Sequence, residues 1–158
     1  MPTIAQAEQF FSLLEAEKQV LERFVQLLKS EQQALVNGGK DELPPITAAK
    51  TTLTDQLVQQ GKQRSVAMSD GNIPTERTEL ADWIKQQTAA HQTLWTAFLQ
   101  LAQEAQTLNN LNGRLVAERL SSNQQAIQTL MAAANRPATY GPDGQTNALG
   151  RGRTLGSA

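Results

Sequence analysis

The chain has no cysteine and one histidine among its 158 residues, and aromatic side chains make up only 4% of it. Without cysteine there is no disulfide, no thiolate nucleophile and no zinc site built on sulfur. The single imidazole, His91, cannot supply the two Glu-x-x-His motifs of a di-iron bundle, and the glycines form no phosphate-binding loop. We therefore expect no catalytic residue, no metal and no cofactor.

The charged residues show no excess of either sign, since 14 basic side chains stand against 15 acidic ones. There is thus no basic field to attract a nucleic-acid backbone or an anionic membrane. No apolar run approaches the roughly 20 residues of a membrane span, and the N-terminus from Met1 to Gln6 lacks the features of a signal peptide. We expect a cytoplasmic protein that binds no nucleic acid and does not insert into a membrane.

The first helix is expected to begin after Thr3 and to end near Asn37. Residues 3–6, with the sequence TIAQ, match a capping box. Gly38 and Gly39 tolerate the left-handed conformation that closes many helices.

The apolar seam of this first helix has a seven-residue period. Glu17 and Glu31 fall in the same heptad column as Phe10 and Phe24, so we expect that column to lie at the edge of the seam. The repeating apolar pairs are Leu13/Leu14, Val20/Leu21, Leu27/Leu28 and Ala34/Leu35.

A second, weaker helix is expected after Pro44, because Pro45 fits the first turn of a helix, where its missing N–H costs nothing. Gly61 interrupts the apolar stripe of this helix. The stretch 69–74 contains Gly, Asn and Pro and predicts a loop.

A long periodic segment follows, capped by Thr75 or Thr78 and without proline up to Pro137. Its one internal glycine, Gly113, predicts a bend or a close helix crossing, and whether the segment forms one helix or two stays open. Residues 135–158 carry five glycines and two prolines with few apolar side chains, which predicts a flexible tail.

These segments together predict an all-α fold, because no stretch shows the alternation typical of strands. We expect an antiparallel, coiled-coil-like bundle of three or four long helices over residues 1–134, followed by a disordered C-terminal tail over residues 135–158. Trp83 and Trp95 lie in the apolar stripe and are expected to anchor the core.

The apolar stripe of the long segment is wider than packing against two neighbouring helices requires. Adjacent apolar pairs, such as Phe98/Leu99 and Leu115/Val116, widen it. Such a stripe either belongs to a central, buried helix or offers a second face to an amphipathic helix of a partner, and the sequence leaves both open.

Two motifs stand out in the C-terminal half: LNNLNGRL at residues 108–115, continued by NQQAI at 123–127, and TYGPDGQT at 139–146. They follow an N-terminal helix that ends in a glycine turn and a helix that contains Ala49-Lys50 and Leu53. In this order the elements resemble the FlgN-type flagellar export chaperones over nearly the whole chain.

The resemblance implies a non-enzymatic, cytoplasmic chaperone of the flagellar type III secretion system. Its clients would be FlgK and FlgL, the hook–filament junction proteins, whose terminal helices must not associate before export. It further implies that Tyr140 docks the chaperone to the export gate protein FlhA. The wide stripe would then hold the client helix through Leu108, Leu111, Leu115, Val116, Leu120 and Ile127.

Two hypotheses from other classes stay open. A histidine phosphotransfer bundle would use His91, although Gln92 and Thr93 differ from the lysine and small residue that usually follow such a histidine. A structural coiled-coil subunit would self-associate through the same apolar stripe.

Overall fold

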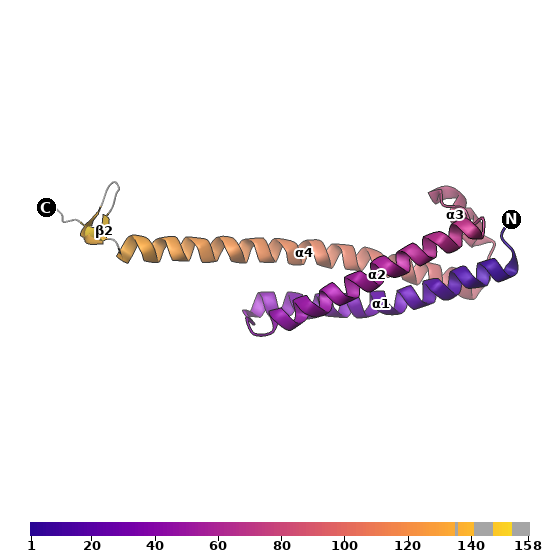
Figure 1. Ribbon diagram of the computed structural model, residues 1–158, viewed down its shortest axis with the longest axis horizontal. Coiled ribbons are helices and arrows are strands. Elements are labelled where there is room, and N and C mark those ends of the chain that lie inside the picture. The colour runs from indigo at the N-terminus through magenta and orange to yellow at the C-terminus, as the bar shows by residue number, and fades with distance from the viewer. Residues whose placement is uncertain (135, 141–146, 153–158) are drawn as a thin grey trace. The chain divides into compact units, whose positions relative to one another are not determined.

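The computed structural model describes residues 1–134, 136–140 and 147–152, with side chains described through Ala134. The chain divides into two units, Met1–Gly113 (unit 1) and Arg114–Ala158 (unit 2). The elements of the described ranges are α1 (Ile4–Asn37), α2 (Leu43–Asp70), α3 (Arg77–Lys85), α4 (Ala89–Ala134), β1 (Arg136–Tyr140) and β2 (Asn147–Gly152) (Figure 1).

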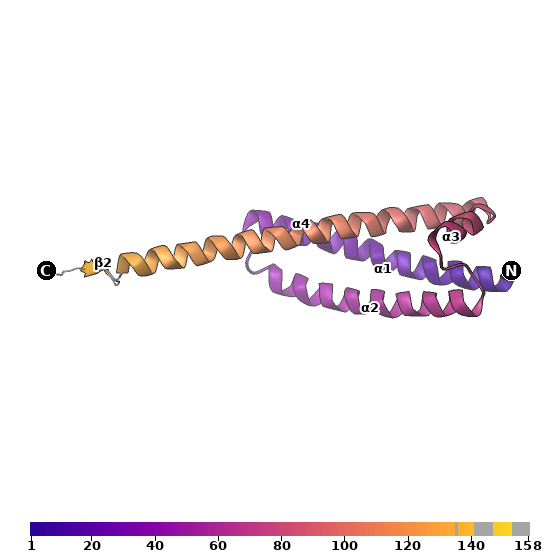
Figure 2. The same ribbon diagram turned by 90° about the horizontal axis from the view of Figure 1, so that it is seen from above.

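The long helices of unit 1 alternate in direction along the chain. α1 and α2 lie side by side (Figure 2), and the side chain of Gln6, at the start of α1, donates to the carbonyl oxygen of Asp70, at the end of α2. The first part of α4 runs parallel to α1, since His91 stacks on Phe11 and Asn112 donates to the carbonyl oxygen of Leu28. The predicted antiparallel helical bundle is confirmed, with three long helices and the short α3.

Both predicted ends of α1 are confirmed. The Thr3 hydroxyl accepts from the backbone N–H of Gln6, and the Gln6 side chain accepts from the backbone N–H of Thr3. Gly38 closes the helix at φ 74°, a left-handed conformation that costs glycine little because it has no Cβ.

α2 is one continuous helix with Pro45 in its first turn, as predicted. Gly61 lies inside it and does not break it. The expected loop follows, and Asn72 adopts the left-handed conformation there with φ 53°.

The long periodic segment forms two helices, α3 and α4, although neither glycine nor proline separates them. Side-chain amides satisfy the carbonyls that the end of α3 exposes. Gln87 Nε2 donates to the carbonyl oxygen of Trp83 over 3.0 Å, and Gln92 Nε2 donates to that of Lys85 over 3.1 Å. α4 then continues through Gly113.

Glu76 caps α3, and the prediction that Thr75 or Thr78 does so was wrong. The Glu76 carboxylate accepts from the Thr78 hydroxyl at 2.6 Å and from the backbone N–H of Glu79 at 3.1 Å. These bonds, the Thr78 hydroxyl foremost, hold the pKa of the Glu76 carboxyl below its usual value. A carboxylate is favoured over a hydroxyl at the N-cap position because a charged acceptor binds N–H donors more strongly.

The core of unit 1 is aliphatic along most of α1. Near the start of α1, where α3 packs against it, the core is aromatic. Phe11 is stacked between Trp83 and His91, with ring centroids 5.7 and 3.9 Å away. Trp83 is buried and Trp95 packs against the core, which confirms both as anchors. The buried core residues, half of them from α1, are Phe10, Phe11, Leu14, Leu21, Val25, Leu28, Met68, Ile73, Trp83, Ile84, Phe98 and Ala105.

β1 and β2 in unit 2 pair as an antiparallel ribbon with an irregular register, in which Arg136 faces Leu149 and Tyr140 faces Asn147. These strands fall in the segment that we expected to be a disordered tail, and the sequence analysis did not predict them. The remaining residues of that segment, 135, 141–146 and 153–158, lie outside the described residues.

Two carboxylates of α1 are buried inside the bundle, although Glu17 and Glu31 were expected at the edge of the seam. Glu17 is 6% exposed and Glu31 is 7% exposed. Each binds a cation from α2: Arg64 Nε lies 2.7 Å from Glu17 Oε1, and Lys50 Nζ lies 3.1 Å from Glu31 Oε1. The edge prediction was wrong because these partners are 47 and 19 residues away in the sequence.

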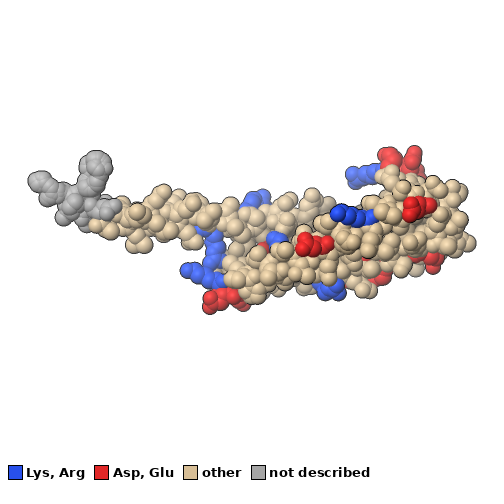
Figure 3. Space-filling view, viewed as in Figure 1, with Lys and Arg blue, Asp and Glu red and all other residues tan. Residues whose placement is uncertain are grey.

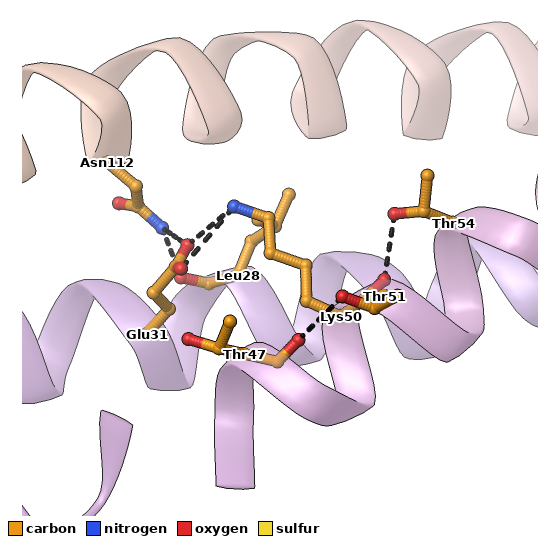
Figure 4. Close-up of polar contacts among 7 residues, drawn as sticks. All are labelled: Leu28, Glu31, Thr47, Lys50, Thr51, Thr54 and Asn112. Atoms are coloured by element: carbon orange, nitrogen blue, oxygen red, sulfur yellow. Dashed lines mark hydrogen bonds and ion pairs between the residues drawn. The ribbon is translucent and has the colours of Figure 1, made fainter. Parts of the chain in front are cut away.

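Glu31 also connects α1 to α4 through Asn112, which is 1% exposed. Asn112 Nδ2 donates to Glu31 Oε1 over 2.9 Å and to the carbonyl oxygen of Leu28 over 2.8 Å (Figure 4). The Arg64 guanidinium links Glu17 to α4 in a similar way, since it lies 5.5 Å from the ring centroid of Phe98. Both buried carboxylates thus fix α2 and α4 on α1.

We predict that Asn112→Ala lowers the free energy of unfolding by about 1–3 kcal/mol, because it leaves Glu31 and a buried carbonyl short of a donor. Urea denaturation measures the change. Asn110→Ala is the matched control on the same helix; Asn110 is exposed, so its replacement should alter stability by no more than about 0.5 kcal/mol. Equal effects of both variants would contradict the role assigned to Asn112.

We also predict that Thr78→Val raises the pKa of Glu76 toward its usual value, as followed by NMR titration, whereas Thr75→Val leaves it unchanged. A carboxyl whose pKa is lower in the folded chain stabilises it above the unfolded pKa, and this stabilisation is lost as the pH falls through the folded value. The stability contributed by the cap should therefore be present at neutral pH and absent in acid. An unshifted pKa in Thr78→Val would contradict this assignment.

Candidate functional site

The described helical part of unit 2, residues 114–134 of α4, carries a row of exposed apolar side chains. Every residue from 120 to 134 is exposed. A row of large exposed apolar side chains on one helix is typical of a surface that binds another molecule. The large members are Val116, Leu120, Ile127, Leu130 and Met131, between 48% and 69% exposed.

The six residues expected to bind a client differ in their surroundings. Leu108 packs against the core of unit 1, and Leu111 and Leu115 are half-buried. Val116, Leu120 and Ile127 are exposed. The exposed surface therefore comprises the later members of the set and continues beyond Ile127.

The spacing of the exposed residues is that of a coiled-coil seam. From Val116 the intervals are four, three, four, three and four residues, as in the a and d positions of a heptad repeat. The sequence analysis missed three of these positions, although the same spacing, read between Leu120 and Ile127 and continued past Ile127, would have found them. We call this set the α4 seam: Val116, Leu120, Asn123, Ile127, Leu130 and Ala134.

The α4 seam continues a helix face that is buried in unit 1. Eighteen residues are five full turns of an α-helix at 3.6 residues per turn, so residues 18 apart share a face. Phe98 and Asn112 are both buried, Phe98 beneath Arg64 of α2 and Asn112 bonded to α1, and they lie 18 residues before Val116 and Leu130. In unit 1 this face of α4 is covered by a helix.

No charged residue occurs between Leu120 and Ala134, where all polar side chains are Ser, Thr, Asn or Gln. Figure 3 shows the same contrast: blue and red side chains gather over the elements of unit 1, whereas the described end of α4 beside the grey segment is tan. From Leu120 to Ala134 the surface around the α4 seam is thus apolar and neutral, whereas Glu118 and Arg119 lie beside its first turn.

His91 does not have the surroundings of a phosphotransfer histidine. Its ring stacks on Phe11, its Nδ1 is buried, and its Nε2 lies 3.1 Å from a carboxylate oxygen of Glu8. A phosphoryl group would meet the negative charge of Glu8 at Nε2 and has no access to Nδ1. The geometry assigns His91 to the aromatic end of the core.

Tyr140, the residue expected to dock to the export gate, is the last residue of β1. Its side chain lies outside the described side chains. Tyr140 follows the last member of the α4 seam, Ala134, by six residues and is not itself part of the seam.

Within residues 1–134, 136–140 and 147–152, no three His, Asp or Glu side chains gather as metal ligands would. None of the helices in this part of the chain has the length and hydropathy of a membrane span.

Comparison with known proteins identifies the family. The model of the FlgN family, described as FlgN protein, matches residues 1–148. No curated protein and no solved structure matches the chain. The match covers both sequence motifs that carry the resemblance. It also covers the bundle of unit 1 and the whole α4 seam. The chain therefore belongs to the FlgN family of flagellar export chaperones.

Proposed function

We propose that this chaperone binds the C-terminal amphipathic segments of the hook–filament junction proteins FlgK and FlgL in the cytoplasm and delivers them to the flagellar export gate. The observation that carries the proposal is the exposed α4 seam, with Leu120 and Ile127 more than half exposed. Family membership supplies the biological setting of export.

A client helix is the occupant that the geometry of α4 supports best. In unit 1 the same helix face is buried at Phe98, Ala105 and Asn112, and the Asn112 side chain binds α1. An amphipathic helix that lays its apolar side along the α4 seam would bury that face in the same manner, through anchors three and four residues apart.

The clients fit this arrangement because a terminal segment that assembles only after export has no partner inside the cell. Such a segment is unfolded on its own and becomes a helix when its apolar side chains are buried against the apolar surface of a partner. Part of the binding energy then orders the segment, so the net affinity remains moderate and release at the gate is possible.

Delivery would use a contact separate from the client surface. We infer that Tyr140 makes this contact with the cytoplasmic part of FlhA, because a tyrosine offers a large ring and a hydroxyl at little entropic cost. Its position in β1 leaves the α4 seam to the client.

We predict that Leu120→Glu weakens binding of the FlgK and FlgL C-terminal segments by about 1–3 kcal/mol, because it places a charge in the apolar seam. Isothermal titration calorimetry measures the loss. Ser121→Glu is the control, since Ser121 follows directly in α4 but is not part of the seam, and it should bind as the wild type does.

Leu115→Glu extends this test to the half-buried part of the predicted surface. A folded variant with weakened binding makes Leu115 a client anchor, whereas loss of the helical circular-dichroism signal makes it a core residue. Unchanged binding in folded Leu120→Glu would contradict the proposed client surface.

We predict that Tyr140→Ala binds FlgK and FlgL with unchanged affinity but binds the FlhA cytoplasmic domain more weakly. Cells with this variant should contain normal amounts of the clients and secrete less of them. Tyr140→Phe, which keeps the ring, separates the contribution of the hydroxyl. Full binding of FlhA by Tyr140→Ala, or loss of client binding, would show that Tyr140 has no separate docking role.

A further inference from the structure

Beyond Arg119, which flanks Leu120, the neutrality of the α4 seam extends to the positions that normally determine the choice of a coiled-coil partner. In the heptad set by Val116 and Leu120, the flanking e and g positions after residue 120 are Gln124, Ala126, Met131 and Ala133. Charged residues at these positions usually form the interhelical ion pairs that set partner choice and orientation. Residues 121–134 contain no charged residue at these or any other positions.

A polar residue, Asn123, lies in the middle of the α4 seam, and it is exposed. A carboxamide at a seam position costs stability unless its hydrogen bonds are satisfied by the opposite helix, and it thereby fixes register. Unit 1 contains a comparable case, since the amide of Asn112 on the same helix is buried and donates to Leu28 and Glu31.

We propose that the α4 seam selects helices with uncharged flanks and with an Asn or Gln opposite Asn123, and that it binds them without ionic attraction. This inference rests on the proposed client-binding function and specifies the chemistry of the client. A charged flank would lose water against Ala126, Met131 and Ala133 and would find no opposite charge there. A neutral flank avoids that cost.

Binding to such a surface responds to salt differently from binding through ion pairs. Salt screens attraction between exposed charges, but it does not weaken apolar burial, and excluded salts such as sulfate strengthen it. Selectivity at the α4 seam then comes from the apolar spacing and from the match to Asn123.

The test uses the full chain and two synthetic amphipathic helices with identical seam residues, including one Asn. One helix has Gln and Ala at its flanks, and the other has Glu and Lys. We expect the neutral helix to bind at least about tenfold more tightly, with a Kd that changes less than about twofold between low salt and about 0.5 M NaCl. Fluorescence anisotropy measures both.

A third peptide, the neutral helix with Leu in place of its Asn, tests the register. The wild type should prefer the Asn peptide, and Asn123→Leu should lose this preference. Gln128→Leu is the control: it also replaces a carboxamide side chain with Leu in the same stretch of α4, but outside the seam, and it should keep the preference.

Four results would overturn the proposal: equal or tighter binding of the charged helix, a Kd of the neutral helix that rises about tenfold with salt, no binding of either helix, or a chain that is already dimeric through the seam. Sedimentation of wild type and Leu120→Glu detects the last. The FlgK and FlgL segments form a separate arm. If the neutral helix binds and the FlgK and FlgL segments do not, the proposed function fails, but the selectivity inferred for the α4 seam stands. If the FlgK and FlgL segments bind through salt-sensitive contacts, the proposed function stands and the inferred selectivity fails.

Discussion

The burial of two carboxylates on α1 is the constraint on which the arrangement of unit 1 depends. A charged group inside a bundle is tolerated only when it is paired, and removing one partner of such a pair is costly. Glu17 and Glu31 take their cationic partners from α2, and Glu31 takes a further donor, Asn112, from α4. Apolar side chains alone would allow the helices to slide, whereas these bonds permit one register.

The same face of α4 is buried in unit 1 and exposed beyond it. In unit 1 that face is buried in the core cluster, and the bonds of Asn112 hold it to α1. From Val116 to Ala134 the described side chains of the face are exposed, neutral and spaced for a second helix. A chaperone that holds a helical segment and later releases it needs such an uncovered face on a helix that is already anchored elsewhere.

Apart from the cap of α3, the features that local chemistry decides were predicted from the sequence, whereas those that depend on distant partners were not. The capping box at Thr3, the glycine end of α1 and the loop after α2 all follow from neighbouring residues, and they were predicted correctly. The burial of Glu31 depends on Asn112, which is 81 residues away. For the candidate surface, periodicity identified the stripe, but only the structure separates Leu108, packed in the core, from exposed Ile127.

Hydrogen–deuterium exchange of the chain with and without the FlgK C-terminal segment tests the central claim most directly. The account predicts that the client slows amide exchange in residues 114–134, where a second helix would cover the α4 seam and suppress local opening, and changes it little in α1 and α2. Protection confined to α1 and α2, with residues 114–134 unchanged, would place the client elsewhere and would contradict the account.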